Sequence, residues 1–395
     1  MRHLILGNGA AGMTAAQKLR EINNDDEITV VTYESDTAYA KIMLPDYIGG
    51  SKQREKLILR DTYYYKTAKI DLLRECNVES IDIVTKSVRL NCKKQLEYDK
   101  LLIATGASQF IPKIEGLKDG DFFTLNSLSD ADKIRQEAKS GKSAVIVGAG
   151  LTGIEISLAL KKSGMNVTII DREKGLLCNQ LDAYSSKVLE DALKSKDIRI
   201  IQGNTVKKVL CEEEKKVFLE DNTMLFFDML IISSGTRPNI KQARDAGIEC
   251  KKGILVDEYS RTSVKDVFAA GDVSEFSNGA KDGYATGYIW PNAMAQGKSA
   301  AFNMAGIEQP FLYTDVKFNP LQLRDIPFIS AGLISPKDEN TEVLTKHEIN
   351  DYRRIILIEN VVKGFVLFGN AKLFAEYLKL FRTQTDISGL KGNLL

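Results

Sequence analysis

Apolar and polar positions near the start of the chain follow a strand, helix, strand order. Residues 2–34 combine a short strand-like run (RHLILG), a stretch with apolar residues at helical spacing (GMTAAQKLREI) and a second strand-like run (EITVVTYE). Residues 143–171 repeat this order with SAVIVG, GIEISLALKKSG and NVTIID. We therefore predict two βαβ units, each opening a parallel sheet.

Further strand-like runs separate and follow these units. VESIDIV (78–84) and KSVRLNC (86–92) alternate in the way expected of a hairpin. Three runs typical of buried strands end at or next to a glycine: LLIATG (101–106), LIISSG (230–235) and VFAAGD (267–272). Because ligands gather at the carboxyl ends of parallel strands, we expect these ends to lie near a binding site.

Changes in composition indicate where domains end. Residues 107–123 are rich in Pro, Gly and charge, which is typical of a linker, and a second boundary is expected near 306–310. The predicted fold class is α/β, with two Rossmann-like dinucleotide-binding domains and a small C-terminal α+β domain. The expected bounds are 1–110 with 239–305 for the first domain, 111–238 for the second, which is inserted into it, and 306–395 for the third.

The bulk composition narrows the class of protein. The chain has 395 residues, of which 44% are hydrophobic and 27% charged, as in an ordinary globular protein. Its formal net charge of +1 gives no sign of nucleic-acid binding. No apolar run approaches the roughly 20 residues that span a bilayer, and no signal peptide precedes the first strand. We expect a cytoplasmic protein that binds neither nucleic acid nor membrane.

Cysteine and histidine are sparse and scattered. The spacing of the five cysteines predicts neither a disulfide framework nor a zinc or iron–sulfur site. They are Cys76, Cys92, Cys178, Cys211 and Cys250. Of the two histidines, His3 lies in the first predicted strand and is expected to be structural, and His347 is expected to be solvated. We predict no metal site.

The first βαβ unit carries a glycine-rich turn of the kind that binds a pyrophosphate. Gly7, Gly9 and Gly12, with Ala10 and Ala11 between them, form Gly-x-Gly-x-x-Gly. We expect the first two glycines to allow close approach of the phosphate and the third to let the helix pack on the strand. Glu34, placed at the end of the second strand, is expected to accept hydrogen bonds from a ribose.

The second unit repeats the turn with Gly148, Gly150 and Gly153. Asp171 ends its second strand. A carboxylate at that position suits the free 2′-hydroxyl of NADH and repels the 2′-phosphate of NADPH, so we predict a preference for NADH. Two dinucleotide sites on one chain indicate electron transfer.

Residues 1–305 resemble the FAD-dependent pyridine-nucleotide oxidoreductases of the glutathione-reductase superfamily. The resemblance rests on the order of the motifs, which are the two glycine turns together with LLIATG, LIISSGTRPN and VFAAGDV. The resemblance implies FAD on the first domain and NADH on the second. It also implies that Asp272 holds the ribityl chain, that the backbone of Val78 contacts the adenine, and that Glu155 lies beside the nicotinamide. Further cofactor-binding residues implied by the motifs are Ala104, Thr105, Gly106, Gly235 and Gly271.

The segment AYAKIML (38–44) departs from the thiol-dependent branches of that superfamily. Their redox cysteine falls at about Ile42 here, and no cysteine precedes Cys76. The chain therefore resembles the cysteine-free branch of rubredoxin and ferredoxin reductases, whose pattern is Tyr-x-Arg-Pro-x-Leu. Tyr39 and Leu44 match this pattern, whereas Lys41 replaces the arginine. Lys41 is expected either to balance the charge of reduced flavin or to pair with Glu155.

Two further residues have candidate roles near the flavin. Trp290 matches an aromatic region before a helix that points at the flavin pyrimidine ring, and it fits core packing equally well. Lys317 is a candidate second cation. The resemblance implies that electrons pass from NADH through FAD to a small carrier, with rubredoxin first and ferredoxin next. Alternatives are a peroxide-forming NADH oxidase, a partner of a nitrite-reductase-like system and, in a different class, an NADH-sensing flavoprotein switch.

Overall fold

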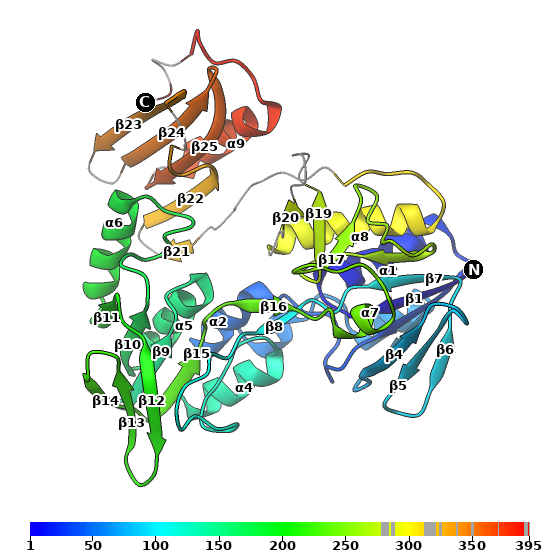
Figure 1. Cartoon of the computed structure of the whole chain (residues 1–395), viewed down its shortest axis with the longest axis horizontal. Coiled ribbons are helices and arrows are strands. Elements are labelled where there is room, and N and C mark those ends of the chain that lie inside the picture. The colour runs from blue at the N-terminus through cyan, green and yellow to red at the C-terminus, as the bar shows by residue number, and fades with distance from the viewer. Residues whose placement is uncertain are drawn as a thin grey trace. The chain divides into compact units, whose positions relative to one another are not determined.

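The computed structural model divides into two compact units, which are described separately (Figure 1). Unit 1 comprises Met1–Phe110, Leu125–Arg135 and Gly235–Tyr313, and unit 2 comprises Ile111–Thr124, Gln136–Ser234 and Thr314–Leu395. The residues that the structure describes are 1–277, 284–285, 289–311, 321–323, 326–336, 339–348, 351–369, 371–390 and 394.

A five-stranded parallel sheet forms the centre of unit 1, in the order β18-β7-β1-β2-β3. The order changes direction between β1 and β7, which is where ligands bind in doubly wound folds. The strands are β1 (Arg2–Leu6), β2 (Glu27–Val31), β3 (Ile70–Leu73), β7 (Lys100–Ile103) and β18 (Val267–Ala269).

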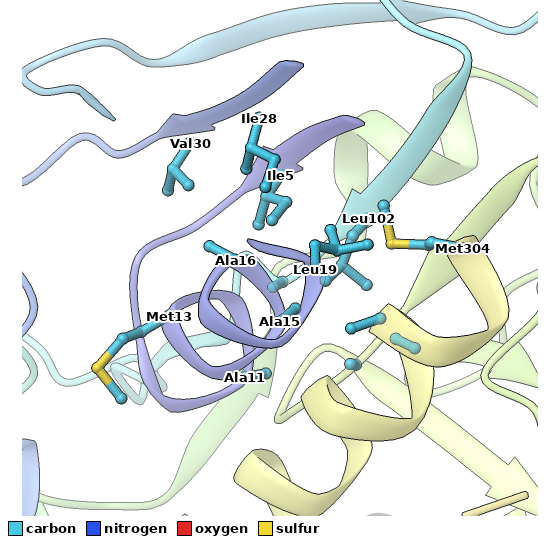
Figure 2. Close-up of a cluster of buried hydrophobic side chains, with 14 of the residues drawn as sticks. Ile5, Ala11, Met13, Ala15, Ala16, Leu19, Ile28, Val30, Leu102 and Met304 are labelled. Atoms are coloured by element: carbon cyan, nitrogen blue, oxygen red, sulfur yellow. The ribbon is translucent and has the colours of Figure 1, made fainter. Parts of the chain in front are cut away.

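Two long helices, α1 (Ala10–Ile22) and α8 (Trp290–Met304), pack against this sheet and against each other. Figure 2 shows Leu19 of α1, Leu102 of β7 and Met304 of α8 in one buried cluster. The helices meet at Gly297, where a Cβ would stand 2.2 Å from the backbone oxygen of Ala11. This close contact fixes the start of α1 beneath α8.

The rest of unit 1 consists of small sheets and short helices. An antiparallel sheet joins β4, β5 and β6, and confirms the predicted hairpin. A second small sheet joins β17, β19 and β20. The strands are β4 (Val78–Asp82), β5 (Ser87–Leu90), β6 (Gln95–Glu97), β17 (Ile254–Val256), β19 (Ser274–Ser277) and β20 (Tyr284–Ala285), and the helices are α2 (Leu44–Ile48), α3 (Thr62–Thr67), α4 (Leu128–Glu137), α7 (Lys241–Asp245) and the 3-10 turns η1 (Lys41–Met43) and η2 (Arg54–Leu57).

The chain leaves unit 1 after β8 (Ala107–Gln109) and returns at β16 (Thr236–Pro238). These two strands pair antiparallel with each other. The predicted linker therefore begins as a strand, because the outgoing and returning segments satisfy each other's backbone groups.

Unit 2 contains a parallel sheet of order β11-β10-β9-β15, the same relative order as β3-β2-β1-β7 of unit 1. An antiparallel sheet, β12-β13-β14, accompanies it. The elements are β9 (Ser143–Val147), α5 (Leu151–Lys162), β10 (Asn166–Asp171), α6 (Ala183–Lys194), β11 (Ile198–Gln202), β12 (Val206–Cys211), β13 (Lys215–Leu219), β14 (Met224–Phe226) and β15 (Met229–Ile232).

A C-terminal antiparallel sheet of order β21-β22-β25-β24-β23 also belongs to unit 2. Tyr352 of this sheet donates a hydrogen bond of 2.6 Å to Asp182, which caps α6. His347 is exposed, which confirms the prediction of a solvated residue, and its ring also lies against Tyr184 and Tyr352. The elements are β21 (Leu321–Leu323), β22 (Ile326–Gly332), β23 (Thr341–Glu348), β24 (Asp351–Ile358), β25 (Val361–Phe368), η3 (Ala371–Leu373) and α9 (Phe374–Thr383).

Several expectations can be compared directly with these elements. Both predicted βαβ units are present, and His3 is buried with its Nε2 atom 3.0 Å from Asp26, as a structural residue would be. The predicted end of the second strand at Glu34 is wrong: β2 ends at Val31, and the Thr32 hydroxyl accepts the backbone N–H of Glu34 in a turn. Within the described residues, no helix has the length and apolar character to cross a bilayer.

Candidate active site

The glycines of the first turn have different physical roles. Gly7 has a φ of +116°, and a Cβ on it would stand 2.1 Å from the backbone oxygen of Ala104. A Cβ on Gly12 would stand 1.9 Å from the oxygen of Gly7. Only Gly9 has open space where its Cβ would be. The missing side chain of Gly7 therefore makes room for the protein backbone, a packing role that the prediction did not include.

The second turn has the same geometry. Gly148 has a φ of +109° and its Cβ would stand 2.2 Å from the oxygen of Ser233, while a Cβ on Gly153 would stand 2.1 Å from the oxygen of Gly148. Gly150 again has open space. In each unit the middle glycine is the one left for a ligand.

The helices that follow both turns begin without a side-chain cap. Gly9 and Gly150 are the N-cap residues of α1 and α5, and neither helix has an acidic residue in its first turn. By contrast, α3 and α6 are capped by Asp61 and Asp182. The first N–H groups of a helix, together with the positive end of its dipole, form an anion site when no side chain occupies them. This donor set fits the pyrophosphate of a dinucleotide in both units.

Segments far apart in the sequence meet at the first turn. Gly7 contacts Ala104 at the end of β7, as described above, and the Cβ position of Gly271 lies 3.1 Å from the Cβ of Ala11. The backbone N–H of Gly271 donates a 2.6 Å hydrogen bond to Gln296 of α8. The predicted motifs around residues 7, 104 and 271 therefore share one edge of the sheet.

Asp272 follows Gly271 at this edge. Burial raises the pKa of its carboxyl to about 6, and the positive charge of Lys41 opposes the rise. Lys41 is therefore close enough to act electrostatically on Asp272. A partly buried carboxylate beside the glycine turn suits hydrogen bonds from the hydroxyls of a ribityl chain.

Lys41 is held by Glu34 and by the backbone of Asn126. Its ammonium group lies 3.0 Å from a Glu34 carboxylate oxygen and donates a 3.0 Å hydrogen bond to the Asn126 carbonyl. Tyr39 donates to the same carboxylate and accepts from the backbone N–H of Leu128 at 2.9 Å. Burial raises the pKa of Tyr39, which keeps its hydroxyl neutral. Lys41 thus pairs with Glu34 within unit 1, and the expected pairing of Lys41 with Glu155 stays a prediction.

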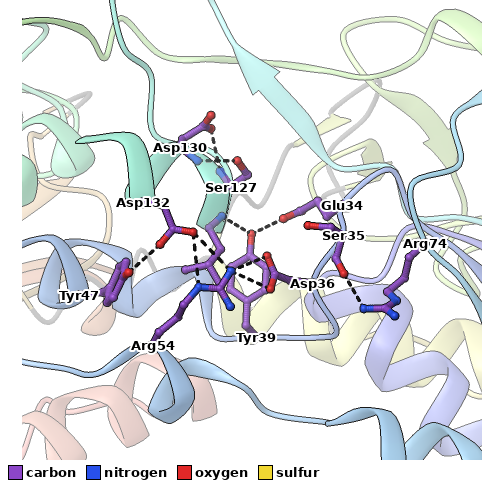
Figure 3. A network of polar contacts seen from close by, with 11 residues as sticks. Glu34, Ser35, Asp36, Tyr39, Tyr47, Arg54, Arg74, Ser127, Asp130 and Asp132 are labelled. Carbon is purple, nitrogen blue, oxygen red and sulfur yellow. Dashed lines mark hydrogen bonds and ion pairs between the residues drawn. The ribbon is translucent and has the colours of Figure 1, made fainter. Parts of the chain in front are cut away.

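A neighbouring network holds the segment that carries Lys41 (Figure 3). Arg54 lies 2.9 Å from Asp36 and 3.4 Å from Asp132 of α4, and the Tyr47 hydroxyl donates to Asp132 at 2.6 Å. Because Arg54 joins two carboxylates from distant parts of the chain, it fixes residues 34–54 against α4.

The remaining predicted site residues of unit 1 are described by their protein contacts. The Val78 carbonyl accepts a 3.2 Å hydrogen bond from Gln242. Thr105 exchanges hydrogen bonds with Asn239, whose backbone N–H also donates to Gly106. Trp290 begins α8 and packs against the buried cluster of Figure 2, which agrees with its packing alternative. Lys317 lies outside the described residues.

In unit 2, Asp171 is bound to its own glycine turn. Its carboxylate accepts the backbone N–H of Ala149 and, at 2.8 Å, that of Glu173. A carboxylate offers about four acceptor positions, so acceptor capacity is left for ribose hydroxyls. Glu155 lies in the first half of α5, two residues after Gly153.

Sequence reasoning missed Asn8 and Gln296 at the first site, and it named Tyr39 only as a match to the family pattern. Gln296 is buried under Gly271, Tyr39 joins Glu34 to α4, and Asn8 accepts a 2.8 Å hydrogen bond from Tyr65. The Nδ2 atom of Asn8 is buried and has no hydrogen-bond partner among the described residues. Asn8 was available as a candidate because it lies between two glycines of the turn. Gln296 carries no local signal.

The family model of the pyridine nucleotide-disulphide oxidoreductases matches residues 1–297. The chain belongs to this family. A model of the rubredoxin NAD+ reductase C-terminal domain matches residues 318–385. Membership confirms the predicted fold class, the prediction of an oxidoreductase, and FAD and NADH as its cofactors.

Individual members of the family give a consistent picture. The chain is 33% identical to an NADH oxidase of Methanocaldococcus jannaschii, over 79% of this chain and 71% of the relative. It is 26% identical to the assimilatory nitrate reductase electron transfer subunit of Bacillus subtilis, but spans about half of that protein. It is 29% identical to the NADH-rubredoxin oxidoreductase of Clostridium acetobutylicum, over 98% of this chain and 96% of the relative. The crystal structure of NADH:rubredoxin oxidoreductase from that organism matches with a TM-score of 0.80 at 26% identity, covering 98% and 97% of the two chains.

One feature sets this family member apart from the disulfide chemistry in the family name. The position expected for the redox cysteine is Ile42, whose side chain is exposed in the 3-10 turn η1. Residues 1–75 contain no cysteine. This segment therefore brings a lysine, Lys41, and no cysteine to the first site.

Proposed function

We propose that this protein is an NADH-dependent FAD reductase of a small electron-carrier protein, with rubredoxin as the favoured carrier. The match to the rubredoxin NAD+ reductase C-terminal domain over residues 318–385 is the observation that carries the proposal. The absence of cysteine before Cys76 supports it, because a carrier reductase needs no thiol next to the flavin.

The side chains of unit 1 would bind FAD and control the charge around it. Gly9 and the uncapped start of α1 would hold the pyrophosphate, Asp272 would accept hydrogen bonds from the ribityl chain, and Lys41 would supply positive charge. FAD, when bound, accepts two electrons as hydride and releases them one at a time. Glu34 and Asn126 keep Lys41 in place and so set the charge that the flavin experiences.

The side chains of unit 2 would bind NADH. Gly150 leaves space for the pyrophosphate at the start of α5, and Asp171 would accept from the adenosine ribose. Glu155 would lie beside the nicotinamide. A cytoplasmic location, and the absence of membrane and nucleic-acid partners, remain part of this proposal.

A peroxide-forming NADH oxidase is the second candidate, because the relative from Methanocaldococcus jannaschii carries that type of name at 33% identity. Ferredoxin reduction and service to a nitrite-reductase-like partner involve the same electron path. The acceptor therefore distinguishes the candidates.

A steady-state comparison of acceptors tests the proposal. NADH consumption by the FAD-loaded protein would be measured with rubredoxin, ferredoxin, oxygen and a low-molecular-weight disulfide at equal concentrations. We expect rubredoxin to give a kcat/KM at least tenfold above the others and the disulfide to give no turnover. Stoichiometric peroxide production at the same rate without a carrier would favour the oxidase, and turnover of the disulfide would contradict the absence of thiol chemistry.

A further inference from the structure

Two cysteines that are separated by 15 residues in sequence lie in contact in unit 1. The Sγ atoms of Cys76 and Cys92 are 3.1 Å apart, at hydrogen-bonding distance. Cys76 lies in the connection between β3 and β4 and is partly buried against the core of unit 1. Cys92 is exposed in the turn between β5 and β6. Cys92 is thus exposed to solvent, and Cys76, in contact with it, is partly buried.

The backbone holds the two sulfurs in this arrangement. The residues next to the cysteines, Asn77 and Asn91, exchange hydrogen bonds of 2.9 and 3.0 Å. The backbone N–H of Cys76 donates to Thr32 at 3.0 Å, which ties its segment to the end of β2. Because both segments are fixed within one unit, the approach of the sulfurs does not depend on how the two units are arranged.

The geometry leads us to propose that Cys76 and Cys92 form a reversible dithiol–disulfide site that is oxidised by hydroperoxides. A disulfide needs an S–S distance of about 2.05 Å, so the sulfurs must approach by about 1 Å. Rotation of the exposed Cys92 side chain supplies this movement, because its sulfur faces solvent. The site is separate from the proposed flavin chemistry, which uses no thiol.

The two thiols have different reactivity. The hydrogen bond from Cys76 lowers the pKa of Cys92, and burial raises the pKa of Cys76. Cys92 is therefore the thiolate that attacks, and Cys76 is the thiol that resolves.

The chemical steps balance without a metal or flavin. The Cys92 thiolate attacks the distal oxygen of ROOH, which breaks the O–O bond, gives Cys92 sulfenic acid and releases ROH after protonation. The Cys76 sulfur then attacks the sulfenic sulfur and releases water. The net reaction converts two thiols and ROOH to one disulfide, ROH and water, and an external dithiol reverses it by thiol–disulfide exchange.

The test uses the full-length FAD-loaded protein, reduced and then treated with hydrogen peroxide. We expect accessible thiols under denaturing conditions to fall from five to three, the intact mass to fall by 2 Da, and a peptide linking Cys76 to Cys92 to appear. Dithiothreitol is expected to restore all five thiols. An unchanged thiol count, a different linked pair or a disulfide-bonded dimer would overturn the proposal.

Single variants separate the two roles. With Cys76→Ser, Cys92 has no resolving partner and is expected to gain 32 Da as an irreversible sulfinic acid. With Cys92→Ser, the partly buried Cys76 is expected to stay reduced over the same period. A matched control replaces Cys178, Cys211 and Cys250 by serine, and it is expected to keep the linkage with two thiols lost. Formation of a disulfide with another cysteine at equal rate in the Cys92→Ser variant would overturn the assignment of Cys92.

Discussion

The two glycine turns of this chain have nearly the same backbone geometry, and the side chains around them differ. Gly7 and Gly148 have φ angles of +116° and +109°, and both press against a carbonyl oxygen of a neighbouring strand. The carboxylate that follows is different. Glu34 is held by Tyr39 and Lys41, whereas Asp171 accepts from its own turn at Ala149.

The backbone of the turn and the side chains around it therefore answer to different constraints. The turn itself is dictated by backbone packing, because the outer glycines leave room only for protein atoms. The surroundings differ: unit 1 places a cation and a partly buried carboxylate, Lys41 and Asp272, beside its turn, whereas in unit 2 the Asp171 carboxylate accepts a hydrogen bond from the turn itself. We expect the charge pattern, and not the glycine pattern, to distinguish the proposed flavin site from the proposed nicotinamide site.

The largest expected effect compares glycines within one turn. Gly7→Ala forces a Cβ against the Ala104 oxygen at positive φ, and we expect a loss on the order of 3–5 kcal/mol in the free energy of unfolding, or failure to fold. Gly9→Ala has open space, so we expect the FAD-free protein to lose less than about 1 kcal/mol and FAD affinity to fall at least tenfold. Denaturation and flavin titration measure these effects.

The same pair of changes in unit 2, Gly148→Ala and Gly150→Ala, serves as the matched control. The first is expected to destabilise unit 2 and the second to raise the KM for NADH without loss of FAD. Equal stability of Gly7→Ala and Gly9→Ala would contradict the division of roles within the turn.

A second expected effect concerns two aspartates near β18: Asp266, directly before the strand, and Asp272, shortly after it. Burial raises the pKa of Asp272 to about 6, so the folded FAD-free protein binds this proton more tightly than the unfolded chain. Stability therefore falls as the pH rises from about 4 to 6, and the cost persists above pH 6. We expect Asp272→Asn to stabilise FAD-free protein by about 3 kcal/mol at pH 8 and by almost nothing at pH 4, while FAD binding weakens.

Asp266 is the matched control, because it lies 2.6 Å from both Lys86 and Lys100. Burial alone raises the pKa of Asp266, but the hydrogen bonds from Lys100 and Lys86 outweigh it and lower that pKa. The ionised Asp266 carboxylate stabilises the folded protein at pH values above the pKa that Asp266 has in the unfolded chain, and this stabilisation is lost in acid. Asp266→Asn should therefore destabilise the protein at pH 8. Urea unfolding at both pH values measures the two signs. A loss of stability on Asp272→Asn at pH 8 would contradict the raised pKa.

A third, smaller effect concerns the choice of nicotinamide nucleotide. We expect NADH to be preferred over NADPH. We expect Asp171→Asn to reduce the corresponding difference in activation free energy, calculated from the two kcat/KM values, by about 1–3 kcal/mol. Glu173→Gln changes an exposed carboxylate two residues away and is expected to leave this difference unchanged. Equal or greater kcat/KM for NADPH in the parent protein would refute the interpretation of Asp171.

The smallest expected effect is a null effect of thiol modification on flavin chemistry. Alkylation of the accessible cysteines in folded, FAD-loaded protein should leave carrier reduction nearly unchanged, and two-electron reduction should bleach the flavin without a thiolate charge-transfer band. FAD should also be released by acid precipitation, since it is held without a covalent bond. Loss of turnover on alkylation, with flavin and fold retained, would place a thiol at the site.

The local pattern of the chain was sufficient for the two βαβ units, the glycine turns and the gathering of residues 104 and 271 at one sheet edge. These features follow from nearest-neighbour geometry: apolar periodicity selects the element, positive φ selects glycine, and parallel strands share their carboxyl ends. Asp171 was likewise identifiable by its place at the end of a predicted strand, whereas Glu155 came from the resemblance to the family; the roles of both remain predictions.

Only the tertiary structure decided which side chains meet. Lys41 pairs with Glu34, the backbone carbonyl of Asn126, 85 residues away, accepts a hydrogen bond from Lys41, and Gln296 lies beneath Gly271. The spacing of Cys76 and Cys92 matched no cysteine motif, yet the β4–β5 hairpin brings their sulfurs within 3.1 Å. The physical reason is common to these cases: a side-chain contact depends on the register and packing of elements distant in sequence, and the periodicity of one element carries no record of its partner.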